Sequence, residues 1–288
     1  MQFQIYFVMK NIKIVMIIAI VTLAAVSCGS KKTKKEEKPK ALVLYYSQTS
    51  NTKTVAKEIA LRLKADIEEI VPLKPYDGDF DATISRCMQE KEQGIVTEIK
   101  PIAADLSKYD IIFIGYPVWF GTYAPPVETF LKQTDLSGKK IVPFCTFGSG
   151  GLVSSALDMA KAQPKAQMCN GYGVRAARLS AAPKEIDQFL KAEHYIEGEY
   201  DKLGDFTEQH SVSKEESEIF DAAVGDYPMM HAKAASVGSR TVPGGTEYLF
   251  IAIDLPREDM PNMPPAGEMK VYVLVENGKA PVFTQVVR

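Results

Sequence analysis

Six small polar residues stand between an apolar run and a helical pattern near the start of the chain. The run Ala41 to Tyr46 has the composition of a buried parallel strand. The polar residues that follow it are Ser47, Gln48, Thr49, Ser50, Asn51 and Thr52. Apolar residues at helical spacing begin at Val55. A hydroxyl-rich turn that opens a helix presents free backbone N–H groups and the positive end of the helix dipole, which together can bind a phosphate group.

Other readings of this turn remain open. Thr49 or Asn51 could simply cap the helix. The turn is neither a Walker loop, because it lacks Gly-Lys-Ser/Thr, nor a G-x-G-x-x-G turn. Since Lys53 is the only charged residue directly after the turn, dipoles and hydroxyls would meet most of a phosphate's charge.

The turn resembles the FMN phosphate loop of the flavodoxin family, whose pattern is close to T/S-x-T-G-x-T. Ser47, Thr49, Asn51 and Thr52 match that pattern. Ser50 stands where the family usually has glycine, and this departure bears on the local backbone conformation. The resemblance implies that residues 47–52 hold the FMN phosphate.

Strand-like runs alternate with helical patterns up to about Leu203, which is typical of an α/β fold with a parallel sheet. The predicted strands are 41–46, 67–72, 109–115, 140–144 and 173–180, and the predicted helices after the first are 82–93, 127–133, 152–161 and 184–192. Right-handed crossovers give a flavodoxin-like, doubly wound sheet in the order 2-1-3-4-5. Ligands bind such sheets beyond the carboxyl ends of the strands, between the first and third strands.

Two further segments are predicted at that edge. The aromatic segment comprises Pro117, Val118, Trp119, Phe120 and Gly121, and the glycine segment comprises Thr146, Phe147, Gly148, Ser149 and Gly150. Aromatic rings could lie flat on a planar heteroaromatic ring, with Phe147 covering its other face, and glycines allow close approach of the backbone. Alternatively, the aromatic residues pack under the next helix, and the glycines form an ordinary turn into a helix.

The order phosphate loop, aromatic segment, glycine segment resembles flavodoxins and related FMN proteins over residues 41–200. The resemblance implies that the two later segments flank the isoalloxazine ring of FMN. Phe120-Gly121 matches the family's aromatic-glycine step, and which of Trp119 and Phe120 stacks stays open. Neither segment carries an acidic residue, so a reduced, anionic flavin would meet little repulsion, which favours two-electron chemistry.

The first 40 residues are predicted to lie outside the fold. Lysines precede the apolar run 14–26, which suits the core of a signal peptide spanning residues 1–27. The sequence Ala-Val-Ser-Cys resembles a bacterial lipobox, and this implies lipidation of Cys28. An ordinary signal peptide cut nearby is the alternative, and translation could begin at Met1 or Met9. Residues 28–40 would be a charged tether from a membrane in the bacterial cell envelope, on the side away from the cytoplasm.

Composition excludes several other classes of function. A formal net charge of −2 argues against nucleic acid as a partner. Cys87, Cys145 and Cys169 remain if Cys28 is lipidated, and this odd number without C-x-x-C spacing indicates neither a disulfide framework nor a zinc site. The three histidines all lie after residue 190, so a histidine metal site near the loops is not expected.

The alternation of strands and helices stops in residues 204–288, which we predict to be a second, smaller α+β domain. Ser213 and Glu216 have the spacing of a capping box at the start of a helix. Four strands are predicted after it, at 229–237, 246–254, 269–276 and 281–287. Gly244-Gly245 joins two of them, and Asn277-Gly278 is a strong hairpin signal.

One helix and four antiparallel strands are similar to the cystatin fold. The inhibitory signature Q-x-V-x-G is poor, because Thr241 replaces Gln and Pro243 replaces Val, and only Gly245 fits. A docking or structural module is therefore a better prediction than a protease inhibitor.

The sequence predicts a membrane-tethered, FMN-binding flavoprotein that acts in electron transfer or as a reductase of quinones or similar small acceptors. Its redox partner is not indicated, and no residue stands out as a catalytic acid or base, although Tyr123 and Ser149 could donate protons. The alternative is a non-enzymatic envelope module that docks a protein partner through its flavodoxin-like scaffold and residues 204–288.

Overall fold

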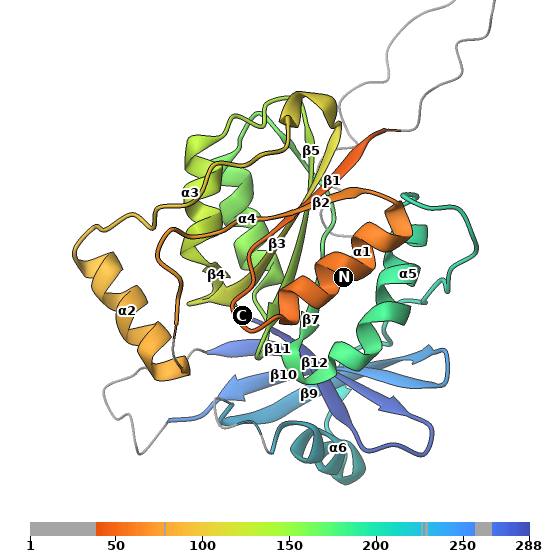
Figure 1. Ribbon diagram of the computed structural model, residues 1–288. Coiled ribbons are helices and arrows are strands. Elements are labelled where there is room, and N and C mark those ends of the chain that lie inside the picture. The colour runs from red at the N-terminus through yellow and green to blue at the C-terminus, as the bar shows by residue number, and fades with distance from the viewer. Residues whose placement is uncertain (1–38, 78, 226, 228–229, 257–266) are drawn as a thin grey trace, which may run out of the picture. The chain divides into compact units, whose positions relative to one another are not determined.

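The computed structural model describes residues 39–288 except 78, 226, 228–229 and 257–266. It shows a parallel sheet covered by helices and, in the C-terminal part, a separate antiparallel sheet with one helix (Figure 1). The predicted signal peptide, the lipidation site Cys28 and nearly all of the tether lie outside the described residues.

The parallel sheet has the predicted strand order. Its main strands are β1 (Ala41–Tyr45), β2 (Asp66–Glu69), β3 (Ile111–Trp119), β5 (Lys140–Phe147) and β7 (Tyr172–Arg175). They pair in parallel as β2-β1-β3-β5-β7, and the short β6 (Gln167–Met168) pairs with the start of β5. The predicted order 2-1-3-4-5 is thus confirmed. Both β6 and β7 pair with β5 at the position of the predicted fifth strand.

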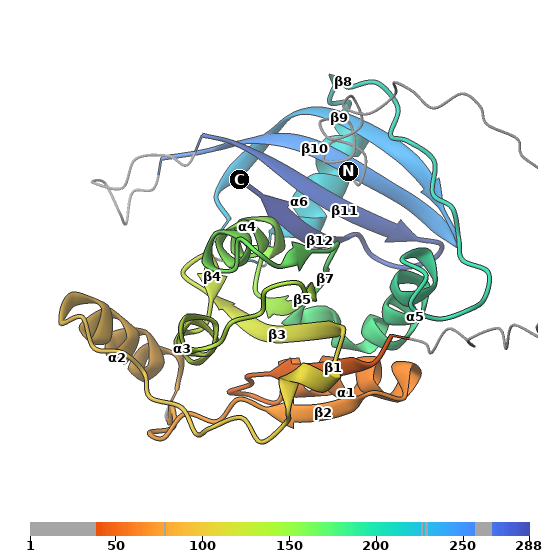
Figure 2. The same ribbon diagram turned by 90° about the horizontal axis from the view of Figure 1, so that it is seen from above.

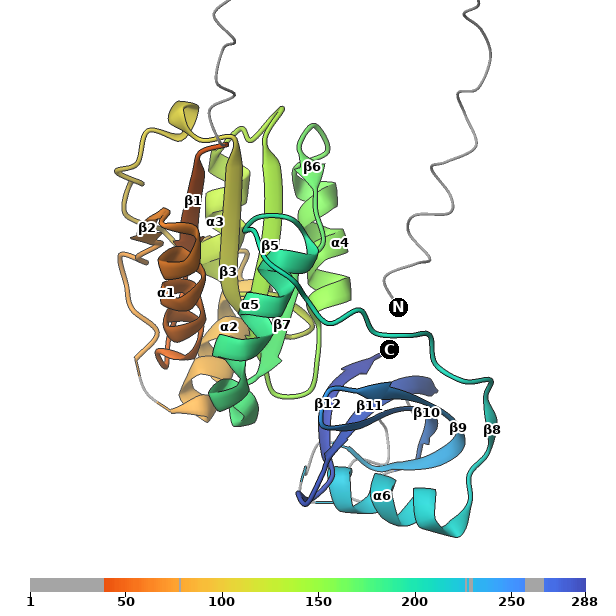
Figure 3. The same cartoon turned by 90° about the vertical axis from the view of Figure 1, so that its right-hand side faces the viewer.

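Helices cover both faces of this sheet (Figure 3). They are α1 (Asn51–Leu63) and α5 (Ala182–Ala192) on one face, α3 (Pro125–Gln133) and α4 (Leu152–Ala162) on the other, and α2 (Phe80–Glu92) in the insertion after β2. Alternate residues of β1 face opposite layers: Val43 belongs to the core with α1 and α5, whereas Leu42 and Leu44 belong to the core with α3 and α4. Each such buried side chain stabilises the fold by about 1.5–3 kcal/mol.

Two strands run further than their apolar patterns predicted. β3 continues through Trp119 and turns back into the two-residue strand β4 (Thr122–Tyr123), and β5 continues through Phe147. The fifth strand, by contrast, ends at Arg175, and a 3-10 helix, η2 (Ala176–Ala181), takes the place of its predicted second half. Alanines in that half offer little of the β-branched packing that supports a strand.

The C-terminal part contains the predicted helix, the four predicted antiparallel strands and one short strand, β8, that the sequence did not indicate. They are α6 (Lys214–Val224), β8 (His210–Ser211), β9 (Ala232–Val242), β10 (Gly245–Asp254), β11 (Glu268–Glu276) and β12 (Val282–Val287), in the sheet order β12-β11-β10-β9-β8. The capping box between Ser213 and Glu216 is confirmed. The rings of Phe220, Phe250 and Phe283 are almost fully buried in its core. The cystatin-like assignment and the domain boundary at residue 204 stay predictions.

The two sheets are in contact within the part of the chain that starts at Pro39. β12 lies beside β7, the edge strand of the parallel sheet (Figure 2). None of the helices described is both long and apolar enough to cross a lipid bilayer.

Candidate functional site

The predicted phosphate loop opens α1 without a side-chain cap. Ser50 is the N-cap residue, and no side chain accepts a hydrogen bond from the first turn of the helix. The alternative in which Thr49 or Asn51 caps the helix is therefore wrong. Ser50 has a φ of 67°, a left-handed conformation that glycine adopts without cost. The loop thus has the backbone that the family's glycine would give it.

Two hydroxyl groups of the loop are buried. The Oγ of Ser47 has no hydrogen-bond partner in the structure, which is rare because burying a hydroxyl without a partner costs free energy. The Oγ1 of Thr52 lies 2.8 Å from the Oγ1 of Thr146, at the end of β5. An unpartnered Ser47 hydroxyl beside an uncapped helix start fits an anion as the missing partner.

The side chains of Gln48 and Lys53 bind other protein groups and not the buried Ser47 hydroxyl. The amide nitrogen of Gln48 donates to the Oγ1 of Thr83 at 2.6 Å, on the side of α2. Lys53 forms an ion pair with Glu69 at 3.0 Å, and the hydroxyl of Tyr45 donates to the same carboxylate. A phosphate in this loop would therefore be met mainly by backbone dipoles and hydroxyls, as the sequence predicted.

The aromatic segment is a tight β-hairpin rather than a loop. Val118 and Trp119 at the end of β3 pair with Tyr123 and Thr122 of β4. The two residues at the tip, Phe120 and Gly121, have φ values of 51° and 79°. Positive φ at both central positions is the geometry of a type I′ turn, in which Phe is unusual because its Cβ is strained there.

The two aromatic residues of the hairpin differ in exposure. The Trp119 ring packs edge-on against Tyr46, with centroids 5.7 Å apart, and against Tyr76, with centroids 5.1 Å apart. Phe120 is 62% exposed at the tip. Trp119 thus belongs largely to an aromatic cluster at the strand ends, while the ring of Phe120 is free to contact a ligand. Tyr76, which completes the cluster, comes from the insertion and carried no sequence signal.

The glycine segment is partly strand and partly a contact with the C-terminal sheet. Thr146 and Phe147 are buried in β5, and the Phe147 ring packs in the core, so it is not placed to cover a ligand. The backbone carbonyl of Ser149 accepts from the N–H of Val286 in β12 at 2.7 Å.

The glycines of this segment face residues of the C-terminal part. A Cβ on Gly148 would lie 2.8 Å from the hydroxyl of Tyr227, and a Cβ on Gly150 would lie 2.0 Å from the carbonyl oxygen of Val286. The sequence suggested that these glycines admit a ligand. The structure shows that another part of the same chain also approaches both glycines closely, which the sequence did not indicate.

The aromatic and glycine segments meet at the start of α4. A Cβ on Gly151 would lie 2.5 Å from a methyl carbon of Val118, so the hairpin packs directly on this turn. The hydroxyl of Ser154 in α4 donates to the carbonyl of Gly121 at 2.6 Å. Together with the Thr52–Thr146 contact, these interactions link all three predicted segments at the carboxyl edge of the sheet.

Two tyrosines near the hairpin are protonated at neutral pH. Burial, followed by the negative charges of Glu128 and Asp158, raises the pKa of Tyr123 to about 12. Burial also raises the pKa of Tyr116, whose hydroxyl lies 3.0 Å from the Oγ of Ser155. The raised pKa makes both hydroxyls weaker acids than an exposed tyrosine, so near pH 7 they can donate hydrogen bonds but cannot serve as bases.

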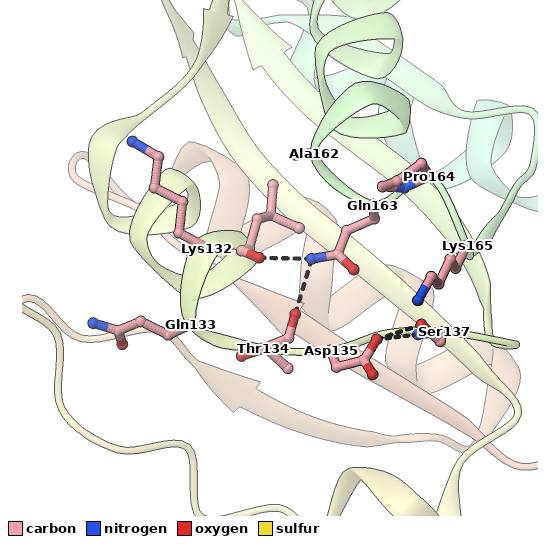
Figure 4. A pocket seen from close by; sticks show the side chains of 10 residues that line it. Lys132, Gln133, Thr134, Asp135, Ser137, Ala162, Gln163, Pro164 and Lys165 are labelled. Carbon is pink, nitrogen blue, oxygen red and sulfur yellow. Dashed lines mark hydrogen bonds between the residues drawn. The ribbon is translucent and has the colours of Figure 1, made fainter.

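A pocket of about 490 Å³ opens at the opposite edge of the sheet, where α3 and α4 end (Figure 4). Its buried residue Gln163 donates to the carbonyls of Leu131 and Thr134 and accepts from the N–H of Leu136. Because these amide groups are already paired and helix carboxyl ends repel anions, the pocket suits a phosphate poorly. The strand-end segments are therefore the better candidate site.

The described residues contain no group of side chains that could hold a metal ion. Cys87, Cys145 and Cys169 are free thiols, and burial raises the pKa of Cys87 to about 11. A thiol with so high a pKa is mostly protonated and unreactive at neutral pH.

Comparison with solved structures finds flavoproteins over about half of this chain. A Bacteroides eggerthii protein, assigned provisionally as a flavoprotein, is 28% identical, with a TM-score of 0.48, and the match covers 54% of this chain and 98% of that one. A Lactobacillus acidophilus flavoprotein in complex with FMN is 27% identical, with a TM-score of 0.41, over 51% and 97% of the two chains. Bacillus cereus flavodoxin 2 is 20% identical, with a TM-score of 0.37, over 54% and 97%.

A protein-family match covers the parallel sheet and its helices. Residues 40–190, just over half of the chain, match the flavodoxin family. The matched residues contain all three strand-end segments. The chain belongs to the flavodoxin family.

Proposed function

We propose that this protein is a membrane-tethered flavoprotein that binds FMN at the carboxyl edge of its parallel sheet. FMN is the cofactor that membership of the flavodoxin family supports. The observation that carries the site assignment is the buried Ser47 hydroxyl, which lacks a partner within the structure and lies in the loop that opens α1. A phosphate group there would accept from this hydroxyl and from the backbone N–H groups of the first helical turn.

The other two segments would hold the ring system. Phe120, exposed at the hairpin tip, would supply an aromatic face, and the backbone of residues 148–150 would supply a second wall. Bound FMN supplies the electron chemistry, and the protein's part is to bind, orient and tune it. The protonated hydroxyl of Tyr123 is available to donate a hydrogen bond near the hairpin.

We assign this flavoprotein to electron transfer or to the reduction of small acceptors such as quinones. The aromatic and glycine segments contain no acidic residue, and Arg175 donates to the carbonyl of Gly148. Because these two segments carry no carboxylate of their own and Arg175 adds a positive charge beside one of them, they would repel a reduced, anionic flavin little, which favours two-electron reduction.

The location of the protein is a further part of the proposal. The lipobox-like sequence ending at Cys28 supports a lipid anchor, and the charged residues up to Lys40 support a tether between that anchor and the fold. Labelling with a radioactive fatty acid in cells, followed by membrane fractionation, should show label in the wild-type protein. The Cys28→Ser variant should lose both the label and the membrane fraction.

Comparison of FMN with riboflavin tests the phosphate site. Both ligands carry the same ring, so the ratio of their dissociation constants, measured by quenching of flavin fluorescence, isolates the phosphate. FMN should bind the wild-type protein at least 10-fold more tightly than riboflavin, and Ser47→Ala should reduce that ratio. Ser137→Ala, at the opposite edge of the sheet, should leave the ratio unchanged.

Two results would contradict this assignment. Equal affinity for FMN and riboflavin would show that the protein does not bind the phosphate group of FMN. Absence of any flavin from protein isolated from native membranes, together with no binding in vitro, would instead favour the non-enzymatic docking module.

A further inference from the structure

Arg175, the last residue of β7, connects the glycine segment to the C-terminal sheet. Its Nε donates to the carbonyl of Gly148 at 2.7 Å, and its Nη1 donates to the carbonyl of Phe283 in β12 at 3.0 Å. Its guanidinium carbon also lies 3.4 Å from the centre of the Phe283 ring. One half-buried side chain thus binds both partners, with the fixed fork geometry that distinguishes Arg from Lys.

A backbone contact reinforces this connection. The N–H of Val286 donates to the carbonyl of Ser149 at 2.7 Å, and Gly150 and Val286 form a parallel β-bridge. β12 is the edge strand of its sheet, with β11 on its other side. The end of β12 therefore uses its free edge to extend onto the glycine segment.

The contact surfaces are closely fitted. There is no room for a side chain at Gly150, whose Cβ would clash with the backbone of Val286, or at Gly148, whose Cβ would press on the Tyr227 hydroxyl. The Tyr227 ring in turn packs against Phe283 with centroids 5.2 Å apart. Side chains and backbone from the C-terminal part thus contact three consecutive residues of the glycine segment.

The same segment is tied to the phosphate loop at its other end. Thr146, two residues before Gly148, shares the buried contact with Thr52 in the first turn of α1. A continuous series of contacts therefore runs from the phosphate loop through the end of β5 and Arg175 to Phe283. A segment that is fixed at both ends loses less conformational freedom when a ligand binds against it.

We propose that the C-terminal sheet braces the flavin site, and that Arg175 is a positioning residue that holds residues 148–150 in the conformation that receives the flavin ring. This inference rests on the proposed function, since it assumes that the segment flanks FMN. It assigns residues 204–288 a role within the flavoprotein itself. The sheet stabilises a wall of the cofactor site, and Val286 and Phe283 are the points at which it does so.

Two variants of the full mature chain each remove a different contact between the C-terminal sheet and the glycine segment. Arg175→Gln removes the charged fork, and Val286→Pro removes the N–H that donates to Ser149. Because that N–H faces the free edge of β12, the proline takes no hydrogen bond from β11. Arg178→Gln is the matched control: Arg178 lies three residues away and pairs with Glu185 at 2.7 Å instead of contacting the glycine segment.

The readouts are the dissociation constant of FMN and the midpoint potential of the bound flavin, both measured well below the melting temperature of each variant. We expect Arg175→Gln and Val286→Pro each to weaken FMN binding by about 10-fold or more, and Arg178→Gln to stay within about twofold of wild type. Arg175→Gln should also shift the midpoint potential, which a purely structural contact would leave unchanged. Arg175→Lys, which keeps the charge and can reach one carbonyl, should recover part of the affinity.

The outcomes separate this inference from the proposed function. Failure of the wild-type chain to bind FMN overturns the proposed function. Tight binding by the wild type with unchanged affinity and potential in both brace variants overturns the brace alone, even if those variants melt at lower temperature.

Discussion

The hydroxyl oxygens of Thr52 and Thr146 lie 2.8 Å apart, and both side chains are buried. One belongs to the first turn of α1 and the other to the end of β5, 94 residues later. Either hydroxyl can donate, so the pair can reorganise when a ligand takes up one of them. This contact sets the spacing between the phosphate loop and the glycine segment.

The pair can be tested by a double-mutant cycle in the FMN-free protein. Thr146→Val leaves the Thr52 hydroxyl buried without a partner and should lower the free energy of unfolding by about 1–3 kcal/mol. Thr52→Val should cost a similar amount, but the double variant should cost clearly less than the sum, because no unpaired hydroxyl remains. Urea denaturation gives all three values, and additive effects would show that the hydroxyls do not interact.

Ser50 provides a second prediction, about backbone strain. A residue with a side chain pays about 1–2 kcal/mol in the left-handed region, and glycine does not. Ser50→Gly should therefore be more stable than Ser50→Ala by about 1 kcal/mol in thermal or urea unfolding, since both variants lose the hydroxyl and differ in the Cβ. FMN affinity of Ser50→Gly should stay near that of wild type, because the loop already has the glycine conformation.

If Ser50→Ala were more stable than Ser50→Gly, the left-handed conformation would not be the source of strain at this position. Lys64, which also has positive φ but lies at the far end of α1, offers a comparison. Lys64→Gly should gain stability over Lys64→Ala in the same way and should have no effect on FMN.

The sequence was sufficient for features that depend on local patterns. The apolar run at the start of β3 predicted a buried strand, and the polar run after β1 predicted the turn that opens α1, because strand burial and helix starts depend on neighbouring residues. The spacing of Ser213 and Glu216 identified the start of α6 for the same reason.

Features that depend on distant contacts were not predictable. The role of Arg175 has no local signal, since its partner Phe283 lies 108 residues away. The glycines of the 148–150 segment indicated that other atoms lie close to the backbone there, but they did not indicate that these atoms belong to the C-terminal part. Only the fold brings the end of β12 against Gly150. The hairpin at Phe120 was missed because its turn residues are not the usual Asn-Gly.

Phe120 leads to a third prediction, in which stability and binding change in opposite directions. Phe120→Asn should relieve the strain of a bulky residue at φ 51° and produce the preferred Asn-Gly turn, with a gain of about 1 kcal/mol. The same change removes the exposed ring and should weaken FMN binding several-fold if that ring contacts the flavin. Such opposed effects are expected where a strained residue serves function.

A second substitution separates the two effects. Phe120→Ala removes the ring but keeps a Cβ in the left-handed region, so it should weaken FMN binding without the gain in stability. If both variants bound FMN as tightly as wild type, Trp119 would be the better candidate for contact with the ring, despite its packing against Tyr46 and Tyr76.

The final prediction concerns how the stability of the C-terminal part depends on pH. Burial raises the pKa of the Glu216 carboxyl, but hydrogen bonds from Ser213 and the nearby His210 together outweigh it, so the folded pKa lies below its ordinary value. The carboxylate accepts from the Ser213 N–H at 2.9 Å and lies 3.0 Å from the His210 ring nitrogen. Because the folded pKa is lowered, this stabilisation is fully present above the unfolded pKa and is lost as the pH falls through the folded pKa.

Glu216→Gln should separate the charge from the hydrogen bond. The Gln side chain can still accept from the Ser213 N–H, as capping boxes allow, but it does not titrate. The variant should therefore lose less stability than wild type between about pH 5 and pH 3, measured by urea unfolding monitored on the C-terminal sheet. Ser213→Ala should cost about 1 kcal/mol at neutral pH because it removes the cap itself. If Glu216→Gln followed the wild-type curve over the whole range, the acid sensitivity of α6 would have to come from other carboxylates.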